Sequence, residues 1–347
     1  MSKILVIVPF ALDAEGVARR RDQLKAVKLE PDSEFHYRPV KAGPTSFMSP
    51  HDWTLMDLAI FEAGASAQEE GYDAVCIDTM SDSGMAALRS VLDIPVVSPG
   101  RASMLFALTL GSKFSVLAQW KPAIVRYKKA IPEWGLASQC ASVRSFDVEP
   151  SFDTLMDGKE DRVFPKMLEV CMKCVEEDGA DVVILGSTTM HQAALWLAER
   201  LPVPLINPGP MTYKLVEAML ALKLTHSRAC YPKPQVPKLD MLHAMLDAAA
   251  AQQRGMKKPD GAAKAAAEPV PSALRASLLG RRGVGTARRQ HRRLVNLVSH
   301  RGTRSYSWPS NYRQQESSRS RKPCAPFTGT SPSFEDFCNC VCRTRAS

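Results

Sequence analysis

Two clusters of small hydroxyl residues stand where an apolar run gives way to a helical pattern. The first is D-T-M-S-D-S-G at 78–84, and the second is G-S-T-T-M-H at 186–191. Small side chains at such a turn leave backbone N–H groups open, and a helix N-terminus favours an anion. Ser, Thr and Asp are also the preferred helix caps, so one such cluster alone indicates capping. Two clusters at corresponding places favour a shared cleft that holds a small acid.

Each cluster also contains a side chain that can carry a proton. His191 is suited to proton transfer near neutral pH, and a partly desolvated Asp82 can act as a base. The alternatives are a helix cap for Asp82 and a first-turn surface residue for His191. Both alternatives stay open at this stage, and the orientation of the two side chains relative to the cleft distinguishes them.

Apolar runs alternate with helical patterns before and between the clusters. The sequence predicts strands at 4–10, 34–40 and 74–78, a strand and turn at 94–100, and helices at 53–70 and 85–92. This order is typical of parallel sheets covered by helices, with strands buried on both faces. Ligands of such open sheets bind beyond the carboxyl ends of the strands, where the two clusters lie.

The first half of the chain is repeated in the second half. Four elements recur in the same order at offsets of 108–110 residues: Lys3 with Lys113, Glu34 with Ser142, Gly71 with Gly179, and Ile94 with Val203. Four elements in register indicate a duplication. We predict an α/β fold of two similar, flavodoxin-like parallel-sheet domains, 1–110 and 111–215, related by a pseudo-two-fold axis. Helices in 216–247 pack on this body, the helix at 213–224 packs back on the first domain, and residues 248–347 form a disordered basic tail.

These motifs resemble the aspartate/glutamate/hydantoin racemase superfamily, and its hydantoin racemase branch most. The segment 71–84 resembles that branch's strand followed by C-F-G-D-P-G, 181–190 resembles its V-L-G-C-A-G-M, and 94–102 resembles its P-V-V-G-x-G-E-A. The similarity covers about residues 3–225. It implies a racemase or isomerase that acts on a small amino acid, carboxylate or hydantoin-type substrate, with neither a cofactor nor a metal.

The resemblance also implies where the site residues are. The family's two catalytic cysteines, one in each half, match Thr79 and Ser187, and with Asp82 and His191 these are the catalytic candidates. The family's N-P-N is Val8-Pro9-Phe10 here, and Arg101 replaces its Glu. The candidate substrate-binding residues are Pro9, Phe10, Met80, Ser81, Ser83, Gly84, Thr188 and Thr189.

The two hydroxyls change the chemistry that is available. A thiol reaches the thiolate form near neutral pH at a helix N-terminus, whereas a Ser or Thr hydroxyl needs an adjacent general base. Three hypotheses follow. The first is a racemase-like isomerase with altered acid and base groups, and the second is a decarboxylase or maleate isomerase-like enzyme that stabilises an enediolate. The third is a non-catalytic small-acid-binding accessory protein of the hydrogenase-expression type.

Charge separates the body from the tail. The chain has 347 residues and a net charge of +9, but residues 251–347 alone carry +14, so the body is weakly acidic and should not bind nucleic acid. The sequence has no apolar run of the roughly 18 residues that a membrane span needs. Nine cysteines without a secretory leader favour a cytoplasmic location with reduced thiols. We expect a small-molecule substrate, and a homo-oligomer is among the options.

The tail should be dispensable for the stability of the body. Its composition cannot bury enough apolar surface to offset the entropy of ordering. We expect deletion of the tail to leave the melting temperature of the body unchanged. A fall of several degrees would show that the tail packs, since 1 kcal/mol moves a domain of ~150–250 residues by ~2–4 °C.

Overall fold

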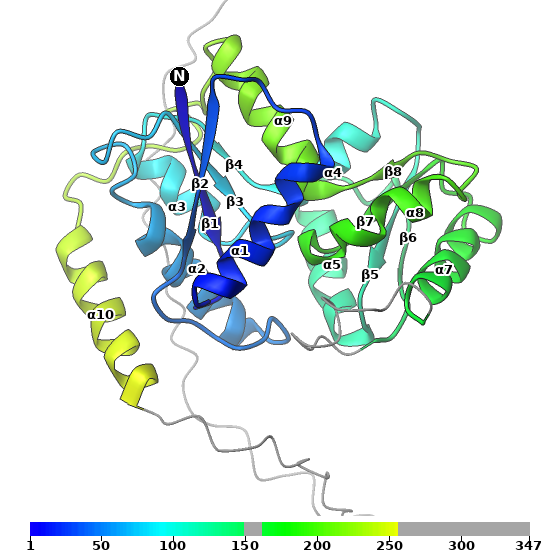
Figure 1. Cartoon of the computed structure of the whole chain (residues 1–347), viewed down its shortest axis with the longest axis horizontal. Helices are drawn as coiled ribbons and strands as arrows, with labels where there is room; N and C mark the ends of the chain where they lie inside the picture. The colour runs from blue at the N-terminus through cyan, green and yellow to red at the C-terminus, as the bar shows by residue number, and fades with distance from the viewer. Residues whose placement is uncertain (149–161, 256–347) are drawn as a thin grey trace, which may run out of the picture. The chain divides into compact units, whose positions relative to one another are not determined.

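The computed structural model describes residues 1–148 and 162–255, which all fall within one compact unit (Figure 1). These residues contain two four-stranded parallel sheets, with strand orders β2-β1-β3-β4 and β6-β5-β7-β8. The first sheet consists of β1 (Ser2–Val8), β2 (Ser33–Pro39), β3 (Ala74–Ile77) and β4 (Val96–Val97), and the second of β5 (Phe114–Ala118), β6 (Cys140–Ser145), β7 (Val182–Leu185) and β8 (Leu205–Ile206). The predicted α/β fold and its duplication are confirmed.

The central strands are apolar because helices cover both of their faces. Residues 4–8 in β1 and 182–185 in β7 are fully buried, as expected for parallel sheets. The register repeats as well: Ile4 lies opposite Ala74 in the first sheet, and Phe114 lies opposite Val182 in the second. The carboxyl ends of corresponding strands therefore present corresponding turns.

Helices follow the strands in both halves. They are α1 (Ala14–Arg21), η1 (Asp22–Ala26), α2 (Pro50–Gly64), α3 (Met85–Val91), α4 (Pro99–Ala107), α5 (Lys121–Glu133), α7 (Phe164–Glu176), η2 (Thr188–Ala193), α8 (Ala194–Ala198), α9 (Pro208–Ala221) and α10 (Leu239–Gly255). Cys171 and Cys174 are fully buried in α7, as packing residues are. No helix in the described segments is long and apolar enough to cross a membrane.

The last helix of each half packs on the other half. Met104 and Ala107 of α4 join the core around β5 and β7, whereas Tyr213 and Val216 of α9 join the core around β1 and β3. The two helices contact each other and lie side by side between the sheets in Figure 1. Packing therefore does not divide the chain at residue 110, although the repeat does.

Three helices differ clearly from the predicted ranges, and one of them, α9, covers Pro208–Ala221 rather than 213–224. Helix α2 begins at Pro50 rather than 53, because Ser49 and Asp52 form a reciprocal capping box, and it ends at Gly64 rather than 70. Helix α10 continues to Gly255, so residues 248–255 belong to the body rather than to the tail. Their alanines favour a helix, and Ala250 packs beside Leu246 against the first core. The rest of the predicted tail, from residue 256, lies outside the described residues, and the deletion that is expected to be neutral begins there.

Candidate active site

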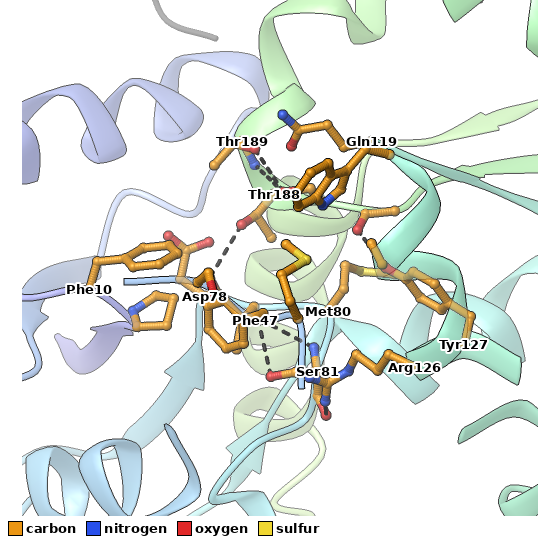
Figure 2. Close-up of a pocket in the computed structure, with 18 of the residues that line it drawn as sticks. Phe10, Phe47, Asp78, Met80, Ser81, Gln119, Arg126, Tyr127, Thr188 and Thr189 are labelled. Atoms are coloured by element: carbon orange, nitrogen blue, oxygen red, sulfur yellow. Dashed lines mark hydrogen bonds between the residues drawn. The ribbon is translucent and has the colours of Figure 1, made fainter. Parts of the chain in front are cut away.

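A cavity of about 420 Å³ lies at the carboxyl ends of the central strands of both sheets (Figure 2). This volume is typical of a small-molecule site. The walls come from turns after β1, β3, β5 and β7, from α1 and α5, and from the loop before α2. The lining residues are Pro9, Phe10, Arg20, Thr45, Ser46, Phe47, Met48, Asp78, Thr79, Met80, Ser81, Gln119, Trp120, Ala123, Arg126, Tyr127, Gly186, Ser187, Thr188 and Thr189.

The structure brings most of the predicted site residues to this cavity. Thr79 and Ser187, from corresponding turns of the two halves, both line it. Six of the predicted substrate-binding residues line it as well: Pro9, Phe10, Met80, Ser81, Thr188 and Thr189. The other four predicted residues, Asp82, Ser83, Gly84 and His191, are not part of the lining.

The hydroxyls at the two turns bond to one another. Thr79 Oγ1 lies 3.2 Å from Ser81 Oγ, which in turn lies 2.9 Å from Ser83 Oγ. Ser187 Oγ lies 2.7 Å from Thr189 Oγ1 and accepts the backbone N–H of Thr189. Among the described residues, no titratable side chain contacts the hydroxyl of Thr79 or Ser187. An adjacent general base, which would turn either hydroxyl into a nucleophile or base, is therefore not in place there.

Asp82 holds the backbone behind the cavity wall. Its carboxylate accepts the backbone N–H groups of Gly100 at 2.8 Å and Arg101 at 2.9 Å, at the start of α4. Burial raises the pKa of the Asp82 carboxyl group. Asp82 also adopts a φ of 53°, in the left-handed region. A Cβ atom at Gly100 would lie 2.4 Å from the carbonyl oxygen of Met80, so the turn and α4 pack too closely for any larger residue.

Substitution of Asp82 should therefore affect stability more than turnover. Asp82→Ala removes both acceptors and should cost about 1–3 kcal/mol of unfolding free energy. Asp82→Asn should cost less, because Asn keeps a carbonyl acceptor and tolerates the left-handed conformation. We expect thermal melts to show this order. A loss of turnover of about 10²-fold in a folded Asp82→Asn protein would instead show general acid–base catalysis.

His191 is likewise directed into the protein. It is buried in η2, and its Nδ1 lies 3.3 Å from the carbonyl oxygen of Thr188. Burial lowers the pKa of its imidazole, so the neutral form dominates near neutral pH. His191 and Asp82 thus do not face each other across the cavity.

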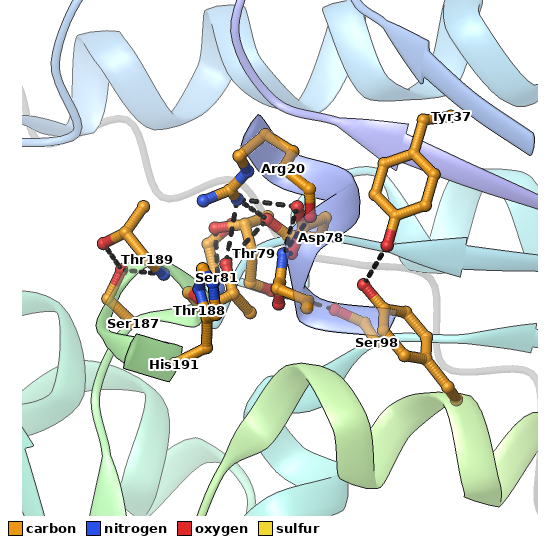
Figure 3. Close-up of polar contacts among 12 residues, drawn as sticks. Arg20, Tyr37, Asp78, Thr79, Ser81, Ser98, Ser187, Thr188, Thr189 and His191 are labelled. Atoms are coloured by element: carbon orange, nitrogen blue, oxygen red, sulfur yellow. Dashed lines mark hydrogen bonds and ion pairs between the residues drawn. The ribbon is translucent and has the colours of Figure 1, made fainter. Parts of the chain in front are cut away.

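A buried ion pair within the first half lies at the cavity, and its arginine also reaches the second half (Figure 3). Arg20 and Asp78 lie 2.7 Å apart, with side chains only 4% and 1% exposed. Arg20 Nη2 also donates to the carbonyl oxygen of Asp78 at 3.1 Å and to Thr188 Oγ1 at 3.0 Å. Gln23 Nε2 donates to the Asp78 carboxylate. The Nε and Nη1 atoms of Arg20 are buried and make no hydrogen bond within the described segments.

The second half contributes residues that sequence reasoning missed. Tyr127 donates its hydroxyl to the carbonyl oxygen of Gly186, and Arg126 donates to that of Ser81. Gln119 and Trp120 follow β5 at 110 residues from Pro9 and Phe10, which line the cavity after β1. The repeat offset was therefore a usable signal for Gln119 and Trp120. Arg20 and Arg126, the arginines of the lining, carry no comparable sequence signal.

The described residues contain no group of three or more His, Cys, Asp and Glu side chains that could hold a metal ion. Asp78 is the carboxylate among the described lining residues, and Arg20 neutralises its charge. The chemistry of this cavity therefore rests on hydroxyls, guanidinium groups and ring N–H groups.

Comparison with known proteins places this fold and site in a family. The family model described as Asp/Glu/Hydantoin racemase matches residues 17–216, which include the turns after β3, β5 and β7 at the cavity but not the turn after β1. The chain belongs to the Asp/Glu/Hydantoin racemase family. The matched range begins within α1 and ends within α9.

Relatives within the Asp/Glu/Hydantoin racemase family include two hydantoin racemases. The protein from Pseudomonas sp. (strain NS671) is 28% identical over 203 residues, covering 56% of this chain and 78% of the relative. The protein from Rhizobium meliloti is 25% identical over 169 residues, covering 48% and 69%. Among solved structures, the allantoin racemase from Klebsiella pneumoniae has a TM-score of 0.62 and 25% identity, covering 68% of this chain and 95% of that one.

Proposed function

We propose that this protein is a racemase-like isomerase that moves a proton at the carbon next to a carbonyl group. Its substrate is a small amino acid, carboxylate or hydantoin-type molecule. The observation that carries the proposal is the meeting of Thr79 and Ser187, from corresponding turns of the duplicated halves, at one cavity. A planar intermediate held between these turns presents one face to each half, which is what inversion of a stereocentre requires.

The donors of the cavity suit an enolate-like intermediate. Removal of a proton next to a carbonyl places negative charge on the carbonyl oxygen, and prearranged donors stabilise that charge. The hydroxyls of Thr79 and Ser187 belong to lining residues, and two N–H groups of Arg20, another lining residue, have no hydrogen-bond partner among the described residues. No cofactor enters the proposed reaction, because these donors take the place of an electron sink.

One observation favours a second candidate, a non-catalytic protein that binds a small acid. Asp82 and His191, the titratable groups expected to exchange the proton, do not line the cavity. Asp78 does line it, but its carboxylate is already engaged by Arg20 and by Gln23. A binding protein needs the donors and the cavity without an acid and base pair.

Deuterium exchange distinguishes the two candidates. Wild-type protein in heavy water is mixed with single enantiomers of amino acids, dicarboxylates, hydantoins and allantoin, and NMR follows the proton next to the carbonyl. The proposed isomerase exchanges that proton and inverts at least one substrate. Loss of carbon dioxide would identify a decarboxylase instead. Binding by calorimetry without exchange of any bound compound would contradict the enzyme and support the binding protein.

A further inference from the structure

The charged side chains of the cavity wall do not balance. Among the described residues they are Arg20, Asp78 and Arg126. Arg20 and Asp78 neutralise each other at 2.7 Å. Arg126 forms no ion pair with any described residue, so the lining residues themselves carry one net positive charge. Figure 2 shows Arg126 and Asp78 on different sides of Met80, so this charge is separate from the ion pair.

Arg126 is held in place but keeps a free donor. It donates to the carbonyl oxygen of Ser81, and its guanidinium carbon lies 5.6 Å from the centre of the Trp53 ring. Its Nη1 atom is buried and has no hydrogen-bond partner among the described residues. The guanidinium group is thus oriented through one nitrogen while the other is unsatisfied.

Nearby carboxylates of the described residues do not accept a hydrogen bond from Arg126 Nη1. Asp57 and Asp82 act on Arg126 through their charge. The carboxylate of Asp57, however, accepts the backbone N–H of Gly84 at 3.0 Å, and that of Asp82 accepts two N–H groups of α4. Burial lowers the pKa of Arg126, but a guanidinium group stays protonated in proteins. A buried charged donor without a partner is costly, and an anion at this point removes the cost.

The other buried side-chain groups of the cavity wall that lack a hydrogen-bond partner within the described segments are donors as well, so they also need acceptors. Trp120 Nε1 and two nitrogens of Arg20 are buried without hydrogen-bond partners in the described part of the chain. Indole and guanidinium nitrogens can only donate. Part of the lining is apolar and includes the rings of Phe10 and Phe47, which form an edge-to-face pair at 5.3 Å. The complementary ligand has several acceptor oxygens on a compact apolar body.

We propose that Arg126 anchors the carboxylate of the substrate, so that the cavity takes small monoanionic carboxylic acids in preference to neutral cyclic amides. This inference rests on the proposed function for the idea of a substrate, but it concerns binding alone. One carboxylate balances the single free charge of the lining. Any remaining oxygens of the same molecule are then acceptors for the other donors of the lining, which belong to Arg20, Thr79 and Ser187. A neutral hydantoin ring would leave Arg126 uncompensated.

A matched pair of ligands tests the proposal. The probes are a hydantoin with an acetate arm on its ring carbon and the same molecule with the acetate converted to its amide. Calorimetric titration of the wild-type protein should show the acetate form binding about 10–100-fold more tightly, as expected for a charge-assisted hydrogen bond. Arg126→Gln should abolish this preference, and Arg126→Lys should keep part of it, because lysine retains the charge without the planar fork.

Lys129→Gln provides the control for general electrostatics. Lys129 lies on the same helix and 5.8 Å from the same Trp53 ring, but it does not line the cavity. The Lys129→Gln protein should keep the preference for the acetate form. Equal or tighter binding of the amide by the wild-type protein, or no binding of the acetate form, would overturn the proposal even if Arg126→Gln failed to fold. A preference that survives in folded Arg126→Gln would overturn it too.

The same probes separate this inference from the proposed isomerase. Exchange at the ring carbon without a preference for the acetate would leave the isomerase standing and remove Arg126 as the anchor. A preference for the acetate without any exchange would contradict the isomerase and support Arg126 as the anchor.

Discussion

Replacement of Arg20 by methionine is expected to lower the free energy of unfolding by about 3–5 kcal/mol. The change leaves the Asp78 carboxylate buried, with Gln23 as its remaining side-chain donor. Methionine has a similar length, so the loss comes from the uncompensated charge more than from a cavity. The melting temperature should fall by roughly 6–20 °C, since ~1 kcal/mol corresponds to ~2–4 °C in a domain of this size.

Two variants control this prediction. Arg21→Met changes the neighbouring arginine, which is exposed, and should leave the melting temperature within error. Addition of Asp78→Asn to Arg20→Met removes the orphaned charge and should recover part of the loss, because a neutral amide is less costly to bury. An Arg20→Met protein as stable as the wild type would show that the buried ion pair does not contribute to the stability of the fold.

Introduction of cysteines at positions 79 and 187 together is expected to raise proton exchange by about 10²-fold or more. These positions line one cavity from opposite halves, and a thiol is a far stronger acid than a hydroxyl. One cysteine then removes a proton as thiolate while the other delivers one as thiol. The measurement is the rate of deuterium incorporation and of inversion for the same panel of substrates.

Single and displaced cysteines show whether the pair is responsible. Thr79→Cys and Ser187→Cys alone should fall short of the double variant, because inversion needs a donor and an acceptor on opposite faces. Ser83→Cys places a thiol in the same turn as Thr79 but outside the lining, and should leave exchange unchanged. A double variant no faster than the wild type would contradict the placement of the two faces. Exchange by the double variant alone would show that the natural protein has lost racemase chemistry.

The fold was predictable because buried strands and duplication both leave marks on the sequence. The runs around Ile4 and Val182 are apolar throughout since both faces of each strand are covered. Constant offsets then indicated two equal sheets, and the strand orders confirm them. The exchange of α4 and α9 between the halves was predicted in part from the sequence. The helix after the last strand was expected to pack back on the first domain. Nothing in the pattern of α4 distinguished one sheet from the other.

The site was predictable at its turns and less so in its charges. Hydroxyls at the ends of β3 and β7 predicted the positions of Thr79 and Ser187, because each of the two parallel sheets presents the carboxyl ends of its strands at one edge. The sequence did not indicate Arg20 as a site residue, because it stands in a run of three arginines. Such a run is typical of an exposed helix, yet the side chain of Arg20 is buried. Asp82 is a residue type that both caps and catalyses, and only the contacts with the N-terminus of α4 show that it caps.

The exchange of α4 and α9 also bears on whether either half can exist alone. A fragment that stops at residue 110 keeps β1 to β4 but lacks Tyr213 and Val216, so it exposes an apolar face of its sheet to water. The complementary fragment lacks Met104 and Ala107 and exposes its own sheet face in the same way. Each fragment thus holds the cover that the other needs. Expressed separately, the two fragments would fold poorly and tend to aggregate. Mixed together, each could cover the exposed sheet face of the other. The cavity therefore requires both halves of the repeat.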